Sequence, residues 1–357
     1  MFALSSSGCG GEGEVFSPFA DGGDELGESS ESDAVETMEA GEASQGETAE
    51  QGESSEDADT DEGTTGPKLD VLGADEDTTA TATMEGGDEG CEKVDLLFVI
   101  DNSNSMSDEQ QLLIDSFPGF IATIENTLPA ASDFHIGVTK TDIHGFDDSP
   151  TPDPNNPCAY ELGGLLSHAT PADEKTGTGA DCEFSSGANY MVGGPSLADE
   201  FACVAEVGTK GNTGERQAEA TLAALAPGNA CSEGFLRKDA LTVVVVITDE
   251  DDDWSEPDAD AATNAQAWYE GVVAVEDGLE SNVVFLLISG GSPAWGDCEP
   301  LDLMTMTGAD TSPKLTAWAE LFTNSNLGSV CSAGYADYLE ASIAVIETAC
   351  GGFEPIP

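Results

Sequence analysis

Side chains with oxygen ligands follow a strongly apolar segment of this 357-residue chain. The apolar run Leu96–Ile100 ends in Asp101, and two serines follow at alternate positions, Ser103 and Ser105. A short apolar run that ends in turn-forming residues is typical of a buried parallel strand. In open α/β sheets, ligands bind just beyond the carboxyl ends of such strands. One carboxylate and two hydroxyls at this place would suit a hard divalent cation.

Two later segments are expected to meet this one at the same edge of a sheet. The first is the glycine-rich loop 208–214, with the sequence GTKGNTG, which comes just before a helical pattern. The second is the pair Thr248-Asp249, which directly follows the apolar run Leu241–Ile247. Because the carboxyl ends of parallel strands lie along one edge, the three segments should converge there.

In this order, the D-x-S-x-S segment, the loop threonine and the Asp after a second strand resemble a von Willebrand factor type A (vWA) domain. The resemblance covers residues 91–353 and implies the family's metal-ion-dependent adhesion site (MIDAS). Its ion would be Mg2+, or Mn2+ or Ca2+, and its ligands here would be Asp101, Ser103, Ser105, Thr213 and Asp249. The serines would bind the ion directly, and the two Asp carboxylates directly or through water.

Such a site favours binding over catalysis. Few direct anionic ligands leave the ion electrophilic, so the carboxylate of a protein or surface ligand can complete its coordination shell. The threonine remains open. The family's common loop reads Gly-Thr-x-Thr-Gly, and an alignment on Thr213-Gly214 places Gly211 in the usual ligand position. Thr213 is favoured, Thr209 is the second choice, and an empty position is the third.

The hydrophobic pattern predicts the elements that position these residues. Strands are expected at 94–100, 133–141, 241–247, 282–288 and 329–332, and helices at 107–126, 197–207, 215–225, 265–276, 314–322 and 335–349. The first helix should open with a capping box, Ser107 followed by Gln110. Alternating strands and helices indicate an α/β fold, a doubly wound and largely parallel sheet flanked by helices. Residues 143–190 are rich in Pro, Gly, Asn and Asp and are expected to be a disulfide-stapled insertion.

The net charge of the chain excludes one class of function, and the composition of residues 10–90 sets that segment apart. Nine Lys and Arg face 71 Asp and Glu, for a formal charge of -62, so nucleic-acid binding is not expected. Residues 10–90 are rich in Gly, Ser, Glu and Thr and poor in aromatic residues, so we expect a disordered acidic tether. The folded vWA-like domain is expected at 91–357.

Eight of the nine cysteines lie in the second part of the chain, which favours disulfides and an extracytoplasmic location. They are Cys91, Cys158, Cys182, Cys203, Cys231, Cys298, Cys331 and Cys350. Sequence alone allows 105 connectivities. The pairing that we favour joins the sequence neighbours Cys158–Cys182, Cys203–Cys231 and Cys298–Cys331, together with a terminal Cys91–Cys350 clasp.

The ninth cysteine, Cys9, follows the small residues 4–8 and precedes a polar segment. This arrangement resembles the processing site of a bacterial lipoprotein, although a basic region is missing and the apolar stretch is short. We expect residues 1–9 to be the remnant of such a signal, with Cys9 as the lipid-bearing residue at the outer membrane or cell surface. The alternative is that Cys9 is incidental. Lipidation would leave an even number of cysteines for disulfides.

The sequence therefore predicts an extracytoplasmic surface protein that binds a protein or surface ligand through a divalent cation. One alternative is a structural or calcium-binding envelope protein in which the acidity itself is the function. A second alternative is a metal-assisted hydrolase. No enzymatic activity is expected, because no general base or nucleophile accompanies the candidate ligands in the sequence.

Overall fold

The computed structural model describes residues 91–128, 131–142, 155–170, 179–211, 214–253 and 261–356. The contacts of the chain divide it into two units, Met1–Thr79 and Ala80–Pro357, and all described residues belong to the second unit. Cys9 and the expected acidic tether at 10–90 lie outside the described residues.

The described residues form a mixed sheet flanked by helices. The strands are β1 (Lys93–Ile100), β2 (Asp133–Lys140), β3 (Met191–Val192), β4 (Leu241–Ile247), β5 (Val283–Ser289) and β6 (Ser325–Ser329). The α-helices are α1 (Ser107–Thr127), α2 (Leu197–Val204), α3 (Gln217–Leu225), α4 (Ala261–Val275), α5 (Pro313–Ala319) and α6 (Ala336–Gly351). The expected α/β fold is confirmed.

The strand order of the sheet is β3-β2-β1-β4-β5-β6. All neighbouring strands are parallel except β2 and β3, which pair antiparallel. From β1 the chain continues to β2 on one side, whereas β4 to β6 build out the other side. The β1–β4 pair is therefore the topological switch point, where a crevice opens beyond the carboxyl ends of the strands. Ile100 pairs with Ile247 there, so both strands end at the same level.

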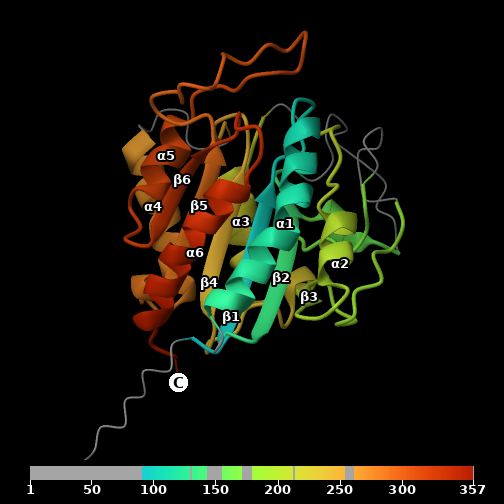
Figure 1. Ribbon diagram of the computed structural model, residues 1–357, viewed down its shortest axis with the longest axis vertical. Helices are drawn as coiled ribbons and strands as arrows, with labels where there is room; N and C mark the ends of the chain where they lie inside the picture. Colours follow the sequence, from blue (N-terminus) through green and yellow to red (C-terminus); the bar gives the residue numbers. More distant parts are fainter. Residues whose placement is uncertain are drawn as a thin grey trace, which may run out of the picture. The chain divides into compact units, whose positions relative to one another are not determined.

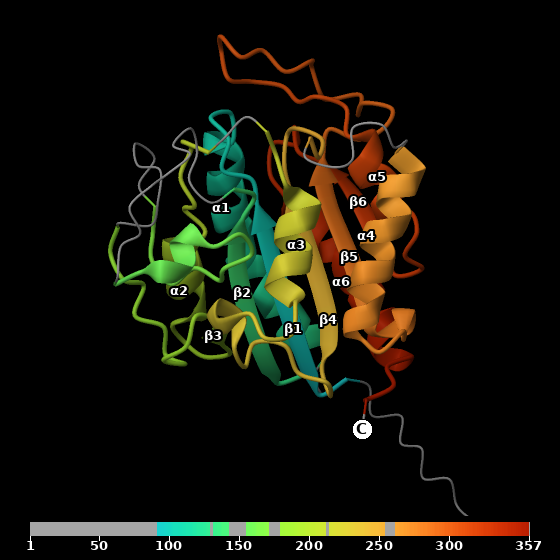
Figure 2. The same ribbon diagram turned by 180° about the vertical axis from the view of Figure 1, so that it is seen from behind.

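Alternate residues of β1 face two separate cores. Leu96 and Phe98 pack with the apolar residues of α1, α2 and α6. Leu97 and Val99 pack with those of α3, α4 and α5. The ribbon views show these two helix groups on opposite faces of the sheet (Figures 1 and 2). Because both faces are covered, β1 and β4 read as continuous apolar runs rather than as alternating patterns.

Most expected elements are present, with small shifts in their bounds. The last strand lies at Ser325–Ser329, four residues before its expected start at 329. The expected capping box is wrong, because α1 has Met106 at its N-cap and no side-chain cap. Gln110, expected to close that box, donates instead to backbone carbonyls of two other segments. Within the expected insertion at 143–190, residues 143–154 and 171–178 lie outside the described residues.

All eight cysteines of the folded part form disulfides, but half of the favoured pairing is wrong. Cys91–Cys350 and Cys298–Cys331 are confirmed. The other two bridges are Cys158–Cys231 and Cys182–Cys203 instead of Cys158–Cys182 and Cys203–Cys231.

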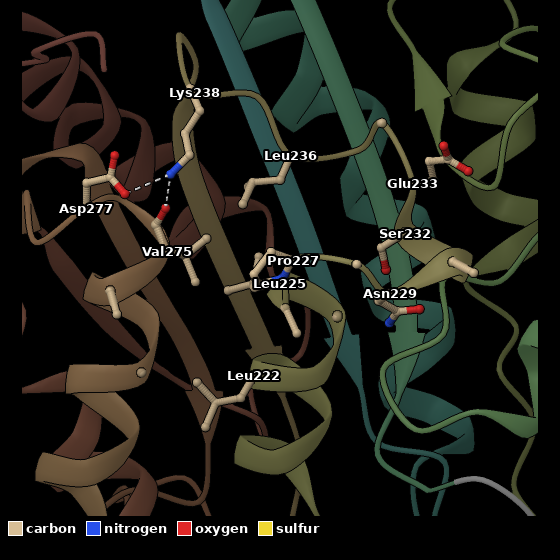
Figure 3. A pocket seen from close by; sticks show the side chains of 17 residues that line it. Leu222, Leu225, Pro227, Asn229, Ser232, Glu233, Leu236, Lys238, Val275 and Asp277 are labelled. Carbon is tan, nitrogen blue, oxygen red and sulfur yellow. Dashed lines mark hydrogen bonds and ion pairs between the residues drawn. The ribbon is translucent and has the colours of Figure 1, made fainter. Parts of the chain in front are cut away.

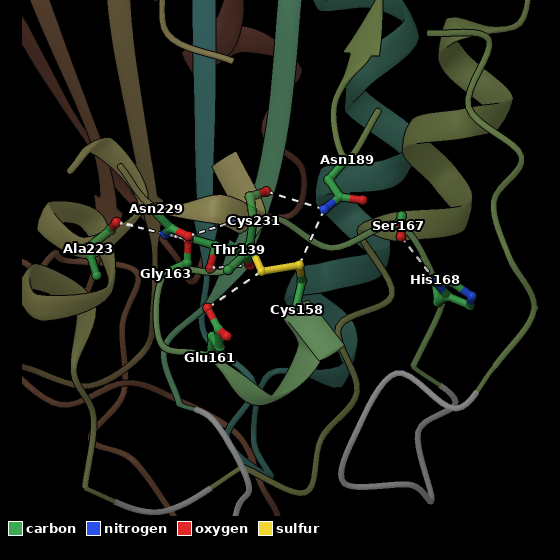
Figure 4. Close-up of a disulfide and its surroundings, with 11 residues drawn as sticks. Thr139, Cys158, Glu161, Gly163, Ser167, His168, Asn189, Ala223, Asn229 and Cys231 are labelled. Carbon is green, nitrogen blue, oxygen red and sulfur yellow. Dashed lines mark hydrogen bonds between the residues drawn. A yellow bond between two sulfur atoms is a disulfide. The ribbon is translucent and has the colours of Figure 1, made fainter. Parts of the chain in front are cut away.

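The physical reason for this correction is visible at Cys158. Its 3-10 helix, η1 (Pro157–Tyr160), lies beside η2 (Ala230–Ser232), which brings the Cα atoms of Cys158 and Cys231 within 5.5 Å (Figure 4). The Asn189 amide donates to Cys158 Sγ and to the carbonyl of Cys231, both at 3.3 Å. Nearness in sequence was a poor guide, because packing places the insertion against the α3–β4 connection.

The four disulfides suggest an oxidising, extracytoplasmic environment, since such bonds persist outside the reducing cytosol. In the part of the chain that the structure describes, no helix has the length and apolar character needed to span a membrane.

Candidate metal site at the carboxyl edge of the sheet

Asp101 occupies the first position after β1 and is completely buried. Its Oδ1 accepts a hydrogen bond from the Ser103 backbone N–H at 2.7 Å. Its Oδ2 accepts one from the Thr248 hydroxyl at 2.6 Å. Burial raises the pKa of Asp101, and these donors offset the rise in part. The carboxylate is therefore held between the end of β1 and the segment that follows β4.

The three expected segments do converge at this edge. The Gln110 amide on α1 donates to the carbonyl of Asp101 at 3.0 Å and to that of Gly208 at 2.9 Å. The backbone N–H of Gly211 donates to the carbonyl of Asn102 at 2.7 Å. A Cβ atom at position 211 would lie 2.6 Å from that carbonyl oxygen, so a glycine is needed for this close approach. Gln110 and Gly211 thus fix the glycine-rich loop against the end of β1.

Asp249 is a buried carboxylate whose two oxygens both lack a hydrogen-bond partner of normal geometry in the described part of the chain. The residue has no solvent exposure, and neither carboxylate oxygen makes a hydrogen bond of normal geometry within the described residues. Burial, and then the negative charge of Asp101, raise its pKa to about 8. The nearby Ser105 hydroxyl opposes this rise only in part. Burying an unpaired carboxylate in its charged form is costly, so a cation beside Asp249 would be favourable.

The two serines complete a set of oxygen atoms. Ser103 and Ser105 are 2% and 5% exposed, and their Oγ atoms lie 3.3 Å apart. Two hydroxyls beside two buried carboxylates are a donor set that fits a hard cation such as Mg2+. The residues present therefore fit the ion that the vWA resemblance implies, and the two unpaired oxygens of Asp249 are the observation behind that statement.

Glu215 is a further buried carboxylate at this site that sequence reasoning missed. It has no solvent exposure, and its Oε2 accepts a hydrogen bond from the Thr141 hydroxyl at 2.5 Å. Its side chain shares a hydrogen bond with Asp101, while its Oε1 has no partner among the described residues. Burial, and then the charge of Asp101, raise its pKa well above the usual range. The sequence offered one indication of this role, because Glu215 directly follows the glycine-rich loop. A Glu at that position is, however, also common at the start of a helix.

Two more acidic side chains raise the negative charge around the site. Burial is the main cause that raises the pKa of Glu250 and of Glu109 to about 7. The charge of Asp101 adds to both shifts. Each of these two residues also has one buried carboxylate oxygen, Oε2, without a hydrogen-bond partner in the described part of the chain. The edge of the sheet thus gathers negative charge that no neighbouring cation balances in full.

Of the loop positions considered for the threonine ligand, the structure describes 209 and 211. Thr213 lies outside the described residues. Thr209 is half-buried and lines a small cavity of about 220 Å³ together with Gln110 and Gly208. Gly211, which the family alignment puts in the usual ligand position, has no side chain to offer.

A larger cavity is present elsewhere in the domain and has a different character. It measures about 920 Å³ and lies between the carboxyl ends of α3 and α4, where Leu222, Leu225 and Leu236 form apolar walls (Figure 3). Its Lys238 is already engaged, because Nζ donates to the carbonyl of Val275 at 2.8 Å and pairs with Asp277 at 3.2 Å. Among the described residues, no carboxylate that lines this cavity is both buried and without a hydrogen-bond partner, so the cavity is not a candidate metal site.

The described residues contain no group of three or more Asp, Glu, His or Cys side chains that could hold a metal ion by themselves. The candidate ligands are two carboxylates, Asp101 and Asp249, and the hydroxyls of Ser103 and Ser105.

Comparisons with known proteins find similarity among solved structures. No protein-family model and no curated protein matches the chain. Solved structures similar to it include proximal thread matrix protein 1 from the mussel byssus, at 10% identity and a TM-score of 0.36, over 73% of this chain and 49% of that one. Another is the human COPII-coat protein Sec24c, at 10% identity and a TM-score of 0.32, over 73% of this chain and 33% of that one. The chain thus spans half or less of the length of these proteins, and its function must be argued from the site.

Proposed function

We propose that residues 91–357 form a vWA-type binding domain that holds a divalent cation at the carboxyl edge of its sheet. Asp101, Ser103, Ser105 and Asp249 would hold the ion, with Thr213 as the favoured loop residue. The observation that carries this proposal is Asp249, which is fully buried and has two unpaired carboxylate oxygens at the topological switch point. A bound Mg2+ would offset the cost of burying that charge and would offer a coordination position to an incoming carboxylate.

The chain's own residues prepare the site in three ways. Gln110 and Gly211 hold the glycine-rich loop against β1. Thr248 and the Ser103 backbone orient the Asp101 carboxylate. The buried surroundings exclude water, so the electrostatic attraction for a cation is strong. We propose a role in binding rather than catalysis, with a protein or surface ligand outside the cytoplasm as the partner.

The first experiment is isothermal titration of Mg2+, Mn2+ and Ca2+ into the full chain, wild type beside Asp101→Ala. We expect one saturable site that is lost in the variant. Asp253→Ala is the matched control, because Asp253 is an exposed acid in the same acidic segment and should leave that site intact. The double variant Ser103→Ala with Ser105→Ala keeps both carboxylates and should weaken binding without removing buried charge.

The titration also separates the alternatives. Weak binding at many sites, equal in the wild type and in Asp101→Ala, would contradict the proposal and favour an acidic, calcium-binding envelope protein. Hydrolysis of an ester or peptide panel that disappears in Asp249→Ala would instead favour a metal-assisted hydrolase. A cation-dependent complex with a carboxylate-bearing ligand, without turnover, is the result that the proposal expects.

A further inference from the structure

The segment 290–312, here called the projecting loop, connects β5 to α5 and extends beyond the carboxyl ends of the strands. Both ribbon views show it in orange at the top of the domain, above the edge where β4 and β5 end (Figures 1 and 2). Its base is joined to the candidate metal site, because the backbone N–H of Asp310 donates to the carbonyl of Asp249 at 2.8 Å. The loop therefore lies on the side of the domain where a ligand of the site would approach.

The arms of the projecting loop are fixed by covalent and hydrogen bonds. The Cys298–Cys331 disulfide ties one arm to the segment after β6. The backbone N–H of Ala309 donates to the carbonyl of Glu299 at 2.9 Å, which pairs the two arms. Gly308 between them has φ +89°, and a Cβ atom there would lie 2.5 Å from the Glu299 carbonyl oxygen. Only glycine allows this close approach of the arms.

Asp302 organises the tip. Its backbone N–H donates to the carbonyl of Thr307 at 2.9 Å, and its own carbonyl accepts from the Met306 N–H at 2.7 Å. Its Oδ1 accepts from the Met304 N–H at 2.8 Å. These bonds close a tight turn over 302–307, so the tip has a defined shape.

This ordered tip presents apolar side chains to solvent. Leu303 is 62% exposed, Met304 is 94% exposed and Met306 is 38% exposed. Across the described ranges four large hydrophobic residues are exposed, and the fourth, Leu321, lies outside the loop. Clustered exposed apolar residues mark interaction surfaces, and methionine adapts its shape to varied partners. A turn built by several hydrogen bonds only to expose three such residues is therefore a candidate contact surface.

The charge of the projecting loop selects the kind of partner. The segment 290–312 contains four acidic residues and no Lys or Arg; the acids are Asp297, Glu299, Asp302 and Asp310. The Met304 backbone N–H lowers the pKa of Asp302, so this carboxylate is ionised beside the apolar tip. An anionic lipid surface would repel the loop. An apolar recess with basic side chains at its rim complements it.

We propose that the tip formed by Leu303, Met304 and Met306 is a docking element for a protein partner with an apolar recess rimmed by basic side chains. The proposal deepens the proposed function and rests on it in one respect, namely that the same partner supplies the carboxylate for the cation. The tip enters the recess, and the acids around it pair with the basic rim. The domain would thereby recognise its partner by the shape and charge of the recess as well as by its carboxylate.

The test uses a displayed random peptide library, selected on the immobilised full chain in the presence of Mg2+. We expect enriched peptides that combine aromatic or aliphatic residues with Arg or Lys. Representative peptides are then synthesised, and their affinities are measured for the wild type and for the double variant Leu303→Ser with Met304→Ser. We expect at least a tenfold loss in the double variant, which corresponds to about 1.4 kcal/mol. The matched control is Leu321→Ser, which removes an exposed leucine outside the loop and should bind as the wild type does.

Each other outcome counts against the docking element. Peptides that bind the double variant as tightly as the wild type would overturn it, and so would failure of the wild type to select any peptide. Tip-dependent binding to phosphatidylcholine vesicles in place of peptides would assign the tip to a lipid surface. Tip-dependent self-association in sedimentation experiments, without peptide selection, would assign it to a second copy of the chain.

The design keeps this proposal separate from the cation site. The double variant is also titrated with Mg2+, and we expect it to bind the ion as the wild type does. If the wild type binds no Mg2+ but still binds peptides through its tip in chelator, the cation proposal fails and the docking element stands. If Mg2+ binds and the tip variant binds peptides as the wild type does, the docking element fails and the cation proposal stands.

Discussion

Two carboxylates at opposite ends of β1 are equally buried and differ in what balances them. Asp95, near the start of the strand, has no solvent exposure, and neither has Asp101, just beyond its end. Arg237 pairs with Asp95, since its Nη2 lies 2.7 Å and its Nε lies 2.8 Å from Oδ1. The backbone N–H of Arg237 also donates to Asp95 Oδ2 at 2.6 Å. Asp101 has hydroxyl and amide donors but no such cationic side chain. The two carboxylate oxygens of Asp249 beside it have no hydrogen-bond partner of normal geometry among the described residues.

The two ends of the sheet therefore differ in whether a buried carboxylate has a cationic side chain as its partner. At the amino end of the sheet, the Arg237 guanidinium pairs with the buried Asp95 carboxylate and partly offsets the burial that raises its pKa to about 7. The neighbouring cavity has apolar walls, and its Lys238 is paired with Asp277. At the carboxyl edge, carboxylates are buried in a cluster without comparable compensation. Native proteins seldom leave buried polar groups unpaired without a reason. The uncompensated end is therefore the end at which a ligand is expected.

The largest effect on the free energy of unfolding is expected from removing the Arg237 side chain that pairs with Asp95. Arg237→Met leaves a buried carboxylate without its partner and should lower the free energy of unfolding by about 3–5 kcal/mol. The measurement is urea unfolding followed by circular dichroism. Lys238→Met is the matched control, because the Lys238–Asp277 pair is exposed and should contribute about 0.5 kcal/mol or less. Equal losses in both variants would mean that the buried Arg237–Asp95 pair contributes no more than the exposed Lys238–Asp277 pair.

A smaller effect is expected on the pH dependence of the unfolding free energy, measured in the presence of a chelator, because of Asp249. The pKa of Asp249 is raised from 3.8 to about 8, so the folded protein holds a proton that the unfolded chain releases. This contribution to stability is complete below about pH 4 and is lost as pH rises to about 8. We expect the loss to reach at least one pKa unit, about 1.4 kcal/mol.

Asp249→Asn should flatten this pH dependence, and Mg2+ should restore the stability of the wild type at pH 8. The affinity for Mg2+ should also rise over the same pH range, because the ion must displace protons from its ligands. The checks are thermal unfolding and cation titration at several pH values. A wild-type profile in chelator that does not decline between pH 4 and pH 8 would contradict the prediction.

An effect of the same order is expected from a substitution at Gly211, where the loop closely approaches the end of β1. In Gly211→Ala, the new Cβ would lie 2.6 Å from the Asn102 carbonyl oxygen, so the loop must move. We expect a loss of about 1–3 kcal/mol in unfolding free energy, together with weaker Mg2+ binding. Gly194→Ala is the control, since nothing lies within 4 Å of a Cβ there. Unchanged Mg2+ affinity in Gly211→Ala would show that this loop does not help to form the site.

Much of the fold could be predicted because local pattern and burial agree. β1 and β4 are apolar throughout and both lie at the centre of the sheet, so their bounds came out within a residue. β6 has the sequence SNLGS and is half-buried, so its weak pattern led to a start placed four residues late. The projecting loop was not foreseen, because its hydrogen bonds join Glu299 to Ala309 and Asp302 to Thr307 without any periodic signal.

The sequence by itself determined that Asp101 and Asp249 follow central strands, because apolar runs fix which segments are buried and where they end. It also determined that the folded part contains enough cysteines for four disulfides. Only the tertiary structure decided that Glu215 faces Asp101, that Gln110 ties α1 to the loop, and that Cys158 bonds Cys231. Each of these depends on which segments pack together, and that is set by the whole core rather than by the residues near them in sequence.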